Sequence, residues 1–224
     1  MNKPETCNNG IKQNGQIPKI IHQIHMGDAN FSDREIFWQK TWKLYNPDWE
    51  YIFWDDSKLK KLKPINQKYI DQSSKYSMKS DLLRYEVLYR YGGIYVDTDF
   101  ECLKNMNDFI SNQDFLICKQ TPPNLHSGVK ICGAFMAAAK HHIVIKKLID
   151  GVEPRSKSHK NKGCVWKYGP GYLNDLVPKS LWLDSGHVYP YMWHEKENQP
   201  TDHNELKKTF PDSYAVHHWN GSWI

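Results

Sequence analysis

The 224-residue sequence contains no long hydrophobic run. A helix that crosses a membrane needs roughly 18 to 20 successive apolar residues, and no stretch approaches that length. The first residues, MNKPETCNNGIKQNGQ, also lack the apolar middle of a signal peptide. We therefore expect a cytoplasmic protein, with an irregular leader over residues 1–16 and a single domain over residues 17–224, long enough to bury a sizeable core.

Cysteine pairs and internal repeats are absent as well. The five cysteines are odd in number, widely spaced and include no C-x-x-C pair. This spacing indicates neither a disulfide framework nor a zinc site, so we expect reduced and mostly buried cysteines. No low-complexity segment or domain linker interrupts the chain.

The chain has no strong excess of either charge. A net charge of +5 and a pI near 8.8 are modest, and we expect no nucleic-acid partner. Lysines concentrate in KLKKLK (58–63) and KSHKNK (157–162). The simplest interpretation is a solvated face. The alternative is contact with an anionic substrate or, as a peripheral attachment, with the acidic inner surface of the membrane.

Aromatic residues, in contrast, are abundant. Phe, Trp and Tyr make up 13% of the chain, and many stand beside polar residues, as in DWEYIFWDD, YPYMWHEK and HHWNGSW. Such rings pack against the faces of sugars and nucleobases. We expect more than half of them to build the core and the rest to be available for a ligand.

The first third of the chain alternates between strand and helix patterns. A run of β-branched residues around Pro18 favours a buried strand, and Asn46-Pro47 is a stop signal for the helix before it. We predict a strand within residues 17–25, a helix from Ser32-Asp33 to about Tyr45, a second strand over residues 49–56, and helical turns over residues 57–75 broken by Pro64.

The stretch SDLLRYEVLYRYGGIYVDTD (80–99) changes its period in the middle. Apolar residues recur at three- and four-residue steps through residues 77–91, which predicts an amphipathic helix. Gly92-Gly93 ends this helix, because glycine adopts a left-handed cap without penalty. The apolar residues 94–96 then predict a buried central strand that places Asp97 and Asp99 at the end of a parallel sheet, where ligands gather.

Two carboxylates one residue apart can face one hard cation, such as Mg²⁺ or Mn²⁺, if the chain turns at Thr98. Without a cation the two charges repel and their pKa values rise. We therefore also expect Asp99→Asn to stabilise the fold slightly. An Asp-x-Asp triplet alone is weak evidence, because it often marks a solvated turn.

The central stretch and four flanking blocks closely resemble the bacterial glycosyltransferases of family 32, a group that contains the yeast initiating mannosyltransferase and is distantly similar to the glucosylating clostridial toxins. The resemblance covers residues 17–223 and implies a GT-A fold, a single α/β domain with a mostly parallel, Rossmann-like central sheet flanked by helices. The blocks occur in the order PKIIHQIHMG (18–27), NPDWEYIFWDD (46–56), SDLLRYEVLYRYGGIYVDTD (80–99), YGP (168–170) and HHWNGSW (217–223).

The resemblance also implies roles for single residues. Asp81 and Arg84 match the family's Ser-Asp-x-x-Arg helix, in which the Asp meets the ribose and the Arg lies near the donor. Their i, i+3 spacing puts both on one helix face. A surface ion pair between them is the alternative. Gly93 and Tyr95 of the same block are further predicted donor-binding residues.

The metal ligands implied by the resemblance are Asp97, Asp99 and His217. Asp97 also reaches the donor, and Asp97, Asp99 and Arg84 form the predicted catalytic set. A neutral imidazole favours Mn²⁺ over Mg²⁺. His218 remains an alternative to His217, and both could instead be structural histidines.

Three more predicted donor contacts lie at the two ends of the chain. Ser222 and Trp223 match the family's closing segment, which covers the diphosphate. The family's first strand often ends Ile-Trp-x-Gly, whereas this chain has His25 at the Trp position, and His25 can still stack on a base. His22 and His25 point to opposite sides of a strand, so we do not expect them to form a metal pair.

The implied activity is metal-dependent, retaining transfer of a sugar from a nucleoside diphosphate sugar, with UDP as the first candidate and GDP as the second. The expected acceptor is a hydroxyl of a glycan or lipid-linked saccharide in capsule or lipopolysaccharide synthesis. Glu101 and Asp175 are weaker candidates for catalytic carboxylates. A metal-dependent phosphoesterase and a non-catalytic carbohydrate-binding protein remain as alternatives, although two-metal phosphoesterase sites require more ligands.

Overall fold

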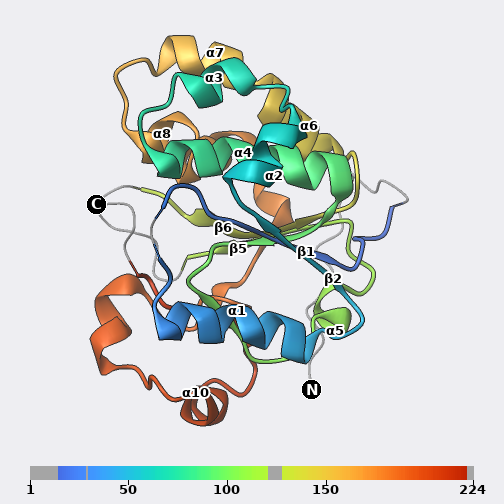
Figure 1. The fold of residues 1–224 in the computed structure, drawn as a ribbon, viewed down its shortest axis with the longest axis vertical. Coiled ribbons are helices and arrows are strands. Elements are labelled where there is room, and N and C mark those ends of the chain that lie inside the picture. The colour runs from blue at the N-terminus through green and yellow to red at the C-terminus, as the bar shows by residue number, and fades with distance from the viewer. Residues whose placement is uncertain (1–14, 29, 121–127, 221–224) are drawn as a thin grey trace.

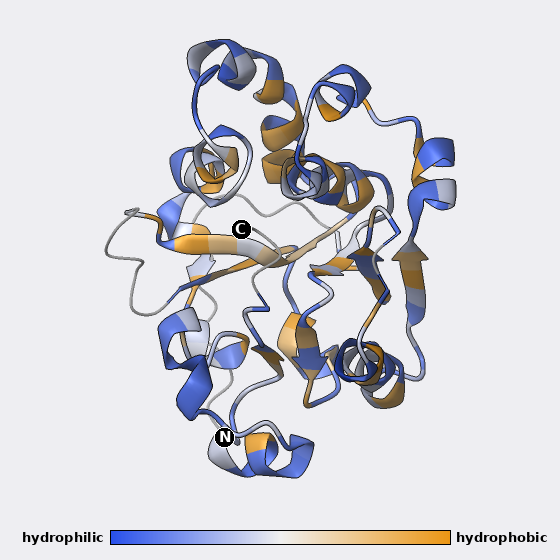
Figure 2. Ribbon diagram, turned by 60° about the vertical axis from the view of Figure 1, so that its left-hand side comes forward, coloured by the Kyte–Doolittle hydropathy of each residue, from blue (hydrophilic) through white to orange (hydrophobic). Residues whose placement is uncertain are grey.

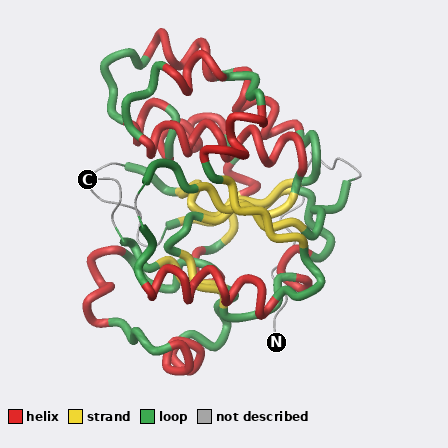
Figure 3. The backbone as a smooth tube through the Cα atoms, in the orientation of Figure 1, coloured by secondary structure: helices red, strands yellow, loops and turns green. Residues whose placement is uncertain are grey.

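The computed structural model describes residues 15–28, 30–120 and 128–220. A six-stranded sheet runs through the middle of the molecule, with helices above and below it (Figure 1). Figure 3 shows the larger sheet as a central layer between two helical layers. Within the described residues, no helix has the length and apolar character needed to cross a bilayer.

The first elements, β1, α1, β2 and α2, follow the order that the sequence predicts. The strands are β1 Ile20–Ile24, β2 Glu50–Trp54, β3 Gly93–Val96, β4 Phe100–Cys102, β5 Phe115–Lys119, β6 Ile131–Ala138, β7 Trp182–Leu183 and β8 Ala215–His217. The α-helices are α1 Asp33–Tyr45, α2 Asp56–Leu62, α3 Gln67–Asp71, α4 Tyr76–Tyr91, α5 Asn107–Ile110, α6 Ile143–Asp150, α7 Val152–Ser158, α8 Cys164–Lys167, α9 Pro170–Leu176 and α10 His203–Thr209. Short 3-10 helices are η1 Lys179–Leu181, η2 Ser185–His187 and η3 Trp193–Asn198.

The central sheet is mixed but mostly parallel. Its strand order is β2-β1-β3-β6-β5-β7. Three of its five pairings are parallel (β1 with β2, β1 with β3, β5 with β7), and β6 runs antiparallel to β3 and β5. The predicted α/β class is confirmed, and β3 has the central position that its apolar sequence indicates. A separate antiparallel pair joins β4 to β8.

Local signals place the early elements where the sequence predicts them. Ser32 caps α1 by accepting from the Glu35 backbone N–H, while the Glu35 side chain reaches back to the Ser32 N–H in a reciprocal capping box. The helix ends at Tyr45, before Asn46-Pro47. Helices α2 and α3 lie on either side of Pro64, as expected for a residue that cannot continue a helix.

The glycine pair between α4 and β3 is required by geometry. Gly92 and Gly93 have φ values of +68° and +98°, in the region that only glycine adopts easily. A Cβ atom on Gly93 would also lie 2.4 Å from the backbone oxygen of Ile20 on β1. The pair therefore ends the helix and allows β3 to approach β1 closely enough for parallel pairing.

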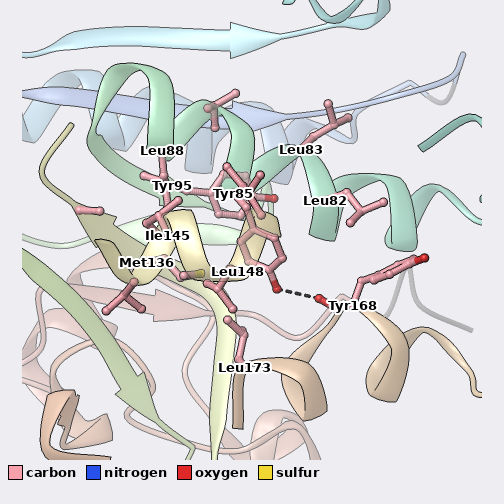
Figure 4. Close-up of a cluster of buried hydrophobic side chains, with 14 of the residues drawn as sticks. Leu82, Leu83, Tyr85, Leu88, Tyr95, Met136, Ile145, Leu148, Tyr168 and Leu173 are labelled. Carbon is pink, nitrogen blue, oxygen red and sulfur yellow. Dashed lines mark hydrogen bonds between the residues drawn. The ribbon is translucent and has the colours of Figure 1, made fainter. Parts of the chain in front are cut away.

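Apolar clusters fill both sides of the sheet. One lies under α4, α6 and α9, where the Tyr85 hydroxyl donates to the Tyr168 backbone oxygen at 2.6 Å (Figure 4). The other faces α1 and α5. Neighbours Phe135 and Met136 on β6 belong to opposite clusters, as the two-residue period of a strand demands. Figure 2 shows apolar residues gathered on the strands and on one side of several helices.

The cysteine prediction is confirmed for the described part of the chain. Cys102, Cys118 and Cys132 are buried, Cys164 is half-buried, and all four are free thiols. Cys7 lies outside the described residues, as does most of the predicted leader at residues 1–14. The leader and the domain limits therefore stay predictions.

His22 on β1 is a structural residue of the core. Its Nε2 lies 2.8 Å from the Gly92 backbone oxygen, and the Trp54 Nε1–H donates to its Nδ1 at 3.1 Å. These partners require the neutral ring, with Nε2 as donor and Nδ1 as acceptor. Burial lowers the pKa of His22 from 6.5 to about 4, although the Gly92 oxygen opposes this shift.

We predict that His22 makes the fold acid-sensitive. Because its pKa is lower in the folded state, its contribution to stability is complete above about pH 6.5 and is lost as the pH falls towards 4. The free energy of unfolding should fall by about 2 kcal/mol between pH 7 and pH 5 from this residue alone. Urea denaturation of wild type, His22→Gln and the exposed-site control His194→Gln tests this, and an unchanged pH slope in His22→Gln would contradict it.

We also predict that Gly93→Ala destabilises the fold by about 3 kcal/mol, because the added Cβ meets backbone and φ is positive. Gly186→Ala is the matched control, since a Cβ there meets no atom within 4 Å. Chemical denaturation should show a change below about 0.5 kcal/mol for the control. Equal stability of the two variants would refute the close-approach argument.

Candidate active site

The two aspartates of the Asp-x-Asp triplet follow β3 directly. The Asp97 backbone N–H donates to the Ala134 backbone oxygen at 2.9 Å, and the Gln23 side-chain amide donates to the Asp97 backbone oxygen at 3.1 Å. Both bonds tie the end of β3 to its neighbours β6 and β1. The chain turns at Thr98 and enters β4 at Phe100, as the metal interpretation of the triplet requires.

The β4–β8 pair brings the end of the chain to the aspartates. Phe100 pairs with His217, and the His218 backbone N–H donates to the Asp99 backbone oxygen at 2.9 Å. The His217 ring stacks on Phe100 with centroids 4.5 Å apart, and its Nε2 lies 3.1 Å from Asp99 Oδ1. A separation of 118 residues in sequence is thereby closed to a hydrogen-bond distance.

Asp97, Asp99 and His217 form one cluster of possible metal ligands. One ligand atom from each lies within 4.8 Å of the others. His217 Nδ1 is also buried without a hydrogen-bond partner in the described part of the chain. Two carboxylates and an imidazole suit a divalent ion such as Mn²⁺. The donor set and geometry therefore fit the metal implied by the family resemblance.

His218 points to a different set of partners. Its ring stacks on Trp38 with centroids 4.1 Å apart, and its Nε2 lies 2.8 Å from Glu101 Oε2. Glu101 also contacts His203 through its other oxygen. Glu101 is thus held by two histidines outside the three-residue cluster, and the structure places His217 rather than His218 beside the aspartates.

Arg84 and Asp81 lie inside the protein, and the surface ion pair considered from the sequence is wrong. Their side chains are 1% and 0% exposed. Arg84 Nη2 lies 3.2 Å from Asp81 Oδ1 and 3.3 Å from Asp97 Oδ1, and the guanidinium lies over the Tyr95 ring at 4.8 Å. One buried cation therefore connects helix α4 to the Asp-x-Asp triplet.

Tyr95 orients the Asp97 carboxylate from the buried side. Its hydroxyl donates to Asp97 Oδ1 at 2.6 Å and lies 3.1 Å from the Ser80 hydroxyl, while its ring is buried. Gly93 is also buried and lies against β1. The structure therefore gives both residues a supporting position, and their predicted contact with the donor stays a prediction.

Two glycines make room for the buried pair, and sequence reasoning gave neither this role. A Cβ on Gly133 would lie 2.7 Å from Arg84 Nη1, and a Cβ on Gly169 would lie 2.9 Å from Asp81 Oδ2. Gly169 belongs to the YGP block, so that block has a packing function. For Gly169 the only signal in the sequence is the proline that follows it, and Gly133 has no such neighbour.

The two aspartates differ in their electrostatics. Burial raises the pKa of Asp97; Arg84 opposes this shift, and the neighbouring Asp99 adds to it. Burial also acts on Asp99, but His217 and the Asn220 backbone N–H, which donates to Asp99 Oδ2 at 2.9 Å, together lower its pKa. The rise in pKa that the sequence predicts for both aspartates is thus found for Asp97 and not for Asp99.

Asp81 carries a larger shift. Burial raises its pKa to about 7, with Arg84 opposing and Asp97 reinforcing the change. Neither of its buried oxygens has a hydrogen-bond partner among the described residues, apart from the ion pair with Arg84. Asp81 and Asp97 therefore compete for one guanidinium, and contact of Asp81 with a ribose stays a prediction.

The remaining predicted residues are placed as follows. His25 is half-buried beside Phe31, at 4.3 Å between ring centroids, whereas His22 is buried with its two ring nitrogens in contact with Gly92 and Trp54. Asp175 forms a surface ion pair with Arg155 at 2.7 Å. Ser222 and Trp223 lie outside the described residues.

Comparison with solved structures supplies the class to which this fold belongs. The structure is similar to the PaToxG glycosyltransferase, with a TM-score of 0.59 and 20% sequence identity over 73% of this chain and 70% of that one. At this identity the likeness shows the fold alone. The chain therefore has the GT-A glycosyltransferase fold that the resemblance implied.

Sequence comparison identifies the family. The model of the glycosyltransferase sugar-binding region containing the DXD motif matches residues 32–116. Inositol phosphoceramide mannosyltransferase 1 of Schizosaccharomyces pombe is 32% identical over 48% of this chain and 35% of its own length. The initiation-specific alpha-1,6-mannosyltransferase of Candida albicans is 30% identical over 72% of this chain and 52% of its own. The matched region, residues 32–116 with the Asp97-x-Asp99 triplet, is that of the DXD glycosyltransferases, in agreement with the family resemblance. The chain spans between about a third and a half of the length of these two relatives.

The electrostatic difference between the aspartates predicts opposite effects of two matched variants. Asp99→Asn should lower the free energy of unfolding by about 1 kcal/mol, because its charge-assisted contacts with His217 and Asn220 weaken. This reverses the expectation drawn from the sequence. Asp97→Asn should leave stability unchanged or raise it, because Arg84 keeps Asp81 as its partner.

The measurement is urea denaturation of both variants in metal-free buffer containing EDTA. Each variant replaces one carboxylate by an amide of the same shape, so each serves as the control for the other. A loss of stability in Asp97→Asn that exceeds the loss in Asp99→Asn would show that the electrostatic assignment is wrong.

Proposed function

We propose that this chain transfers a sugar from a nucleoside diphosphate sugar to a hydroxyl of a glycan or lipid-linked acceptor in a metal-dependent reaction. The observation that carries the proposal is the cluster of Asp97, Asp99 and His217 at the end of β3. The two aspartates lie inside the matched DXD region, and His217 is contributed by β8 outside it. Carboxylate and imidazole ligands leave coordination positions for phosphate oxygens, which a nucleotide-sugar donor supplies.

Asp97, Asp99 and His217 would hold a Mn²⁺ or Mg²⁺ ion, with Mn²⁺ favoured by the imidazole. Such an ion neutralises the charge that develops on a leaving diphosphate. The side chains of Asp97 and Asp99 are each 13% exposed, so a ligand can reach them. Arg84 and Tyr95 fix Asp97 from the buried side, which keeps the carboxylate in place before a ligand arrives.

In the proposed reaction the bond between the anomeric carbon and the diphosphate breaks, and the acceptor oxygen bonds to that carbon. The acceptor proton passes to the leaving phosphate on the same face, so the configuration is retained and no covalent nucleophile is needed. The positions of Glu101 and Asp175 support this view, since Glu101 is held by His203 and His218, and Asp175 by Arg155.

The donor is proposed to be a UDP-sugar first and a GDP-sugar second. The names of the fungal relatives specify mannosyl transfer, which favours mannose as the sugar to test. His25 with Phe31 and Phe53 offers a half-exposed aromatic group on the side of β1 where the base is expected. Asp81 for the ribose and Ser222 and Trp223 for the diphosphate complete the proposed donor site.

An acceptor in bacterial capsule or lipopolysaccharide synthesis, a cytoplasmic location and peripheral contact with the membrane remain parts of the proposal that rest on the family resemblance and the lysine clusters. A phosphoesterase is disfavoured, because the described residues offer one cluster of three ligands rather than a two-metal set. A purely carbohydrate-binding role leaves the buried Arg84 and its two carboxylates without a purpose.

We expect UDP or GDP to raise the melting temperature of the protein when Mn²⁺ is present and to lose this effect in EDTA, because a ligand that binds only the folded state stabilises it. Asp99→Asn should abolish both this effect and sugar transfer, measured as donor hydrolysis where no acceptor is known. If a nucleotide raised the melting temperature equally in EDTA, the metal assignment would be wrong. Turnover by Asp99→Asn at the wild-type rate with saturating donor would also contradict it. Lys208→Gln, at an exposed site on α10, is the control variant and should behave as wild type.

A further inference from the structure

A small polar pocket lies in the helical layer above the sheet, between the α3–α4 segment and the α7–α8 segment. Its volume is about 190 Å³. Figure 1 shows α8 beside the start of α4, with α3 and α7 above them. The pocket is lined by Tyr69, Gln72, Ser73, Ser74, Met78, Lys160, Lys162, Lys167 and Tyr168.

The pocket carries positive charge without compensation. Lys160, Lys162 and Lys167 contribute three ammonium groups, and none of them forms an ion pair with a carboxylate of the described residues. No Asp or Glu lines the pocket. Several other surface lysines do find partners, such as Lys157 with Glu153 at 2.8 Å. Three lysines without a carboxylate partner around one pocket are suited to an anion.

The other lining groups suit a phosphate carried by a hydroxylated molecule. Tyr69, Gln72 and Ser74 add hydroxyl and amide groups that can donate to phosphate or sugar oxygens. Lys167 lies over the Tyr168 ring at 5.4 Å, which holds its stem against the pocket wall. The lining therefore combines charge with neutral donors.

The size of the pocket limits the ligand. A volume of 190 Å³ equals roughly six water molecules at about 30 Å³ each. It is smaller than the roughly 300 to 1,000 Å³ of sites that enclose a whole drug-sized molecule. A pocket of this size can take a phosphoryl group with a short attached fragment.

Residues that line the pocket are close in sequence to residues of the proposed catalytic site. Met78 lines the pocket one turn before Asp81 on α4. Tyr168 lines it from the other side, and its backbone oxygen accepts from Tyr85, one residue after Arg84. The next residue, Gly169, lies against Asp81. A group bound in the pocket is thus one helix turn away from the buried pair that supports Asp97.

We propose that this lysine pocket binds a phosphate group of the acceptor substrate. The word acceptor rests on the proposed function, whereas binding of the phosphate group can be tested without it. Met78 places the pocket at the start of α4, three residues before Asp81. The phosphate could belong to a lipid headgroup or to a water-soluble molecule, and the experiment separates these sources.

The test compares wild type with a triple variant, Lys160→Gln, Lys162→Gln and Lys167→Gln. The matched control is Lys60→Gln, Lys61→Gln and Lys208→Gln, which removes the same charge from exposed positions on α2 and α10. Binding is measured in EDTA, so that the metal site does not hold phosphate. The probes are glycerol 3-phosphate, with glycerol as its neutral counterpart, and phosphatidylglycerol vesicles, with phosphatidylcholine vesicles as theirs.

We expect saturable binding of a phosphate probe by wild type, weakened at least about tenfold in the triple variant and less than about twofold in the control. Binding of glycerol 3-phosphate identifies a soluble phosphate, and saturable binding of phosphatidylglycerol vesicles alone identifies a lipid headgroup. If both variants lost phosphate binding equally, net charge rather than the pocket would explain the binding, and the proposal would be overturned. Absence of saturable binding by wild type to either probe would also overturn it.

A second measurement separates this inference from the proposed function. The triple variant should keep the wild-type melting temperature and metal-dependent donor hydrolysis, because its lysines do not touch the aspartate cluster. Loss of phosphate binding with intact hydrolysis supports the pocket. Phosphate binding by a wild-type protein that hydrolyses no donor would reject the transferase while leaving an anion site.

Discussion

The pairing of β4 with β8 is the constraint on which the site depends. Asp97 and Asp99 leave the central sheet on a two-residue turn, and β4 would otherwise be a three-residue strand without a neighbour. Pairing with β8 satisfies its backbone groups and delivers His217 to Asp99. The Asn220 N–H then reaches the same carboxylate. One short ladder thus assembles the cluster of candidate metal ligands from segments 118 residues apart in sequence.

Buried charge determines how the rest of the site is arranged. An unpaired carboxylate inside a protein is strongly unfavourable, and a charged pair is tolerated only with good geometry and further hydrogen bonds. Arg84 lies between Asp81 and Asp97, and Tyr95 donates to Asp97. Arginine suits this position because its planar group presents several donors and keeps its charge when buried. Gly133 leaves the space that this group needs.

Much of this could be predicted from the sequence, because the signals are local. The capping box at Ser32, the stop at Asn46-Pro47 and the glycine pair before β3 each act within a few residues. Their physical causes are hydrogen bonds and backbone angles that neighbouring residues determine. The same holds for the central position of β3, since a run of apolar residues cannot remain at an edge. The GT-A fold itself came from the family resemblance.

The parts that sequence reasoning missed depend on contacts between distant segments. Nothing near Asp99 indicates that its charge is stabilised by Asn220, so the sequence predicted raised pKa values for both carboxylates, whereas the pKa of Asp99 is lowered. The burial of Asp81 and Arg84 was similarly hidden, because a helix face shows which residues align but not what covers them. Gly169 covers Asp81 from 88 positions away in the numbering, and only the folded chain reveals that its missing side chain is what permits the contact.

These distant contacts also explain why α4 is central to the proposed activity. Its last turn ends in the glycines that bring β3 against β1, its middle holds Arg84 beneath Asp97, and its first turns line the lysine pocket. A 16-residue helix spans about 24 Å at about 1.5 Å per residue. A rigid helix of that length can keep two binding regions and one metal cluster in fixed register, which is the geometric requirement for joining two substrates at a single bond.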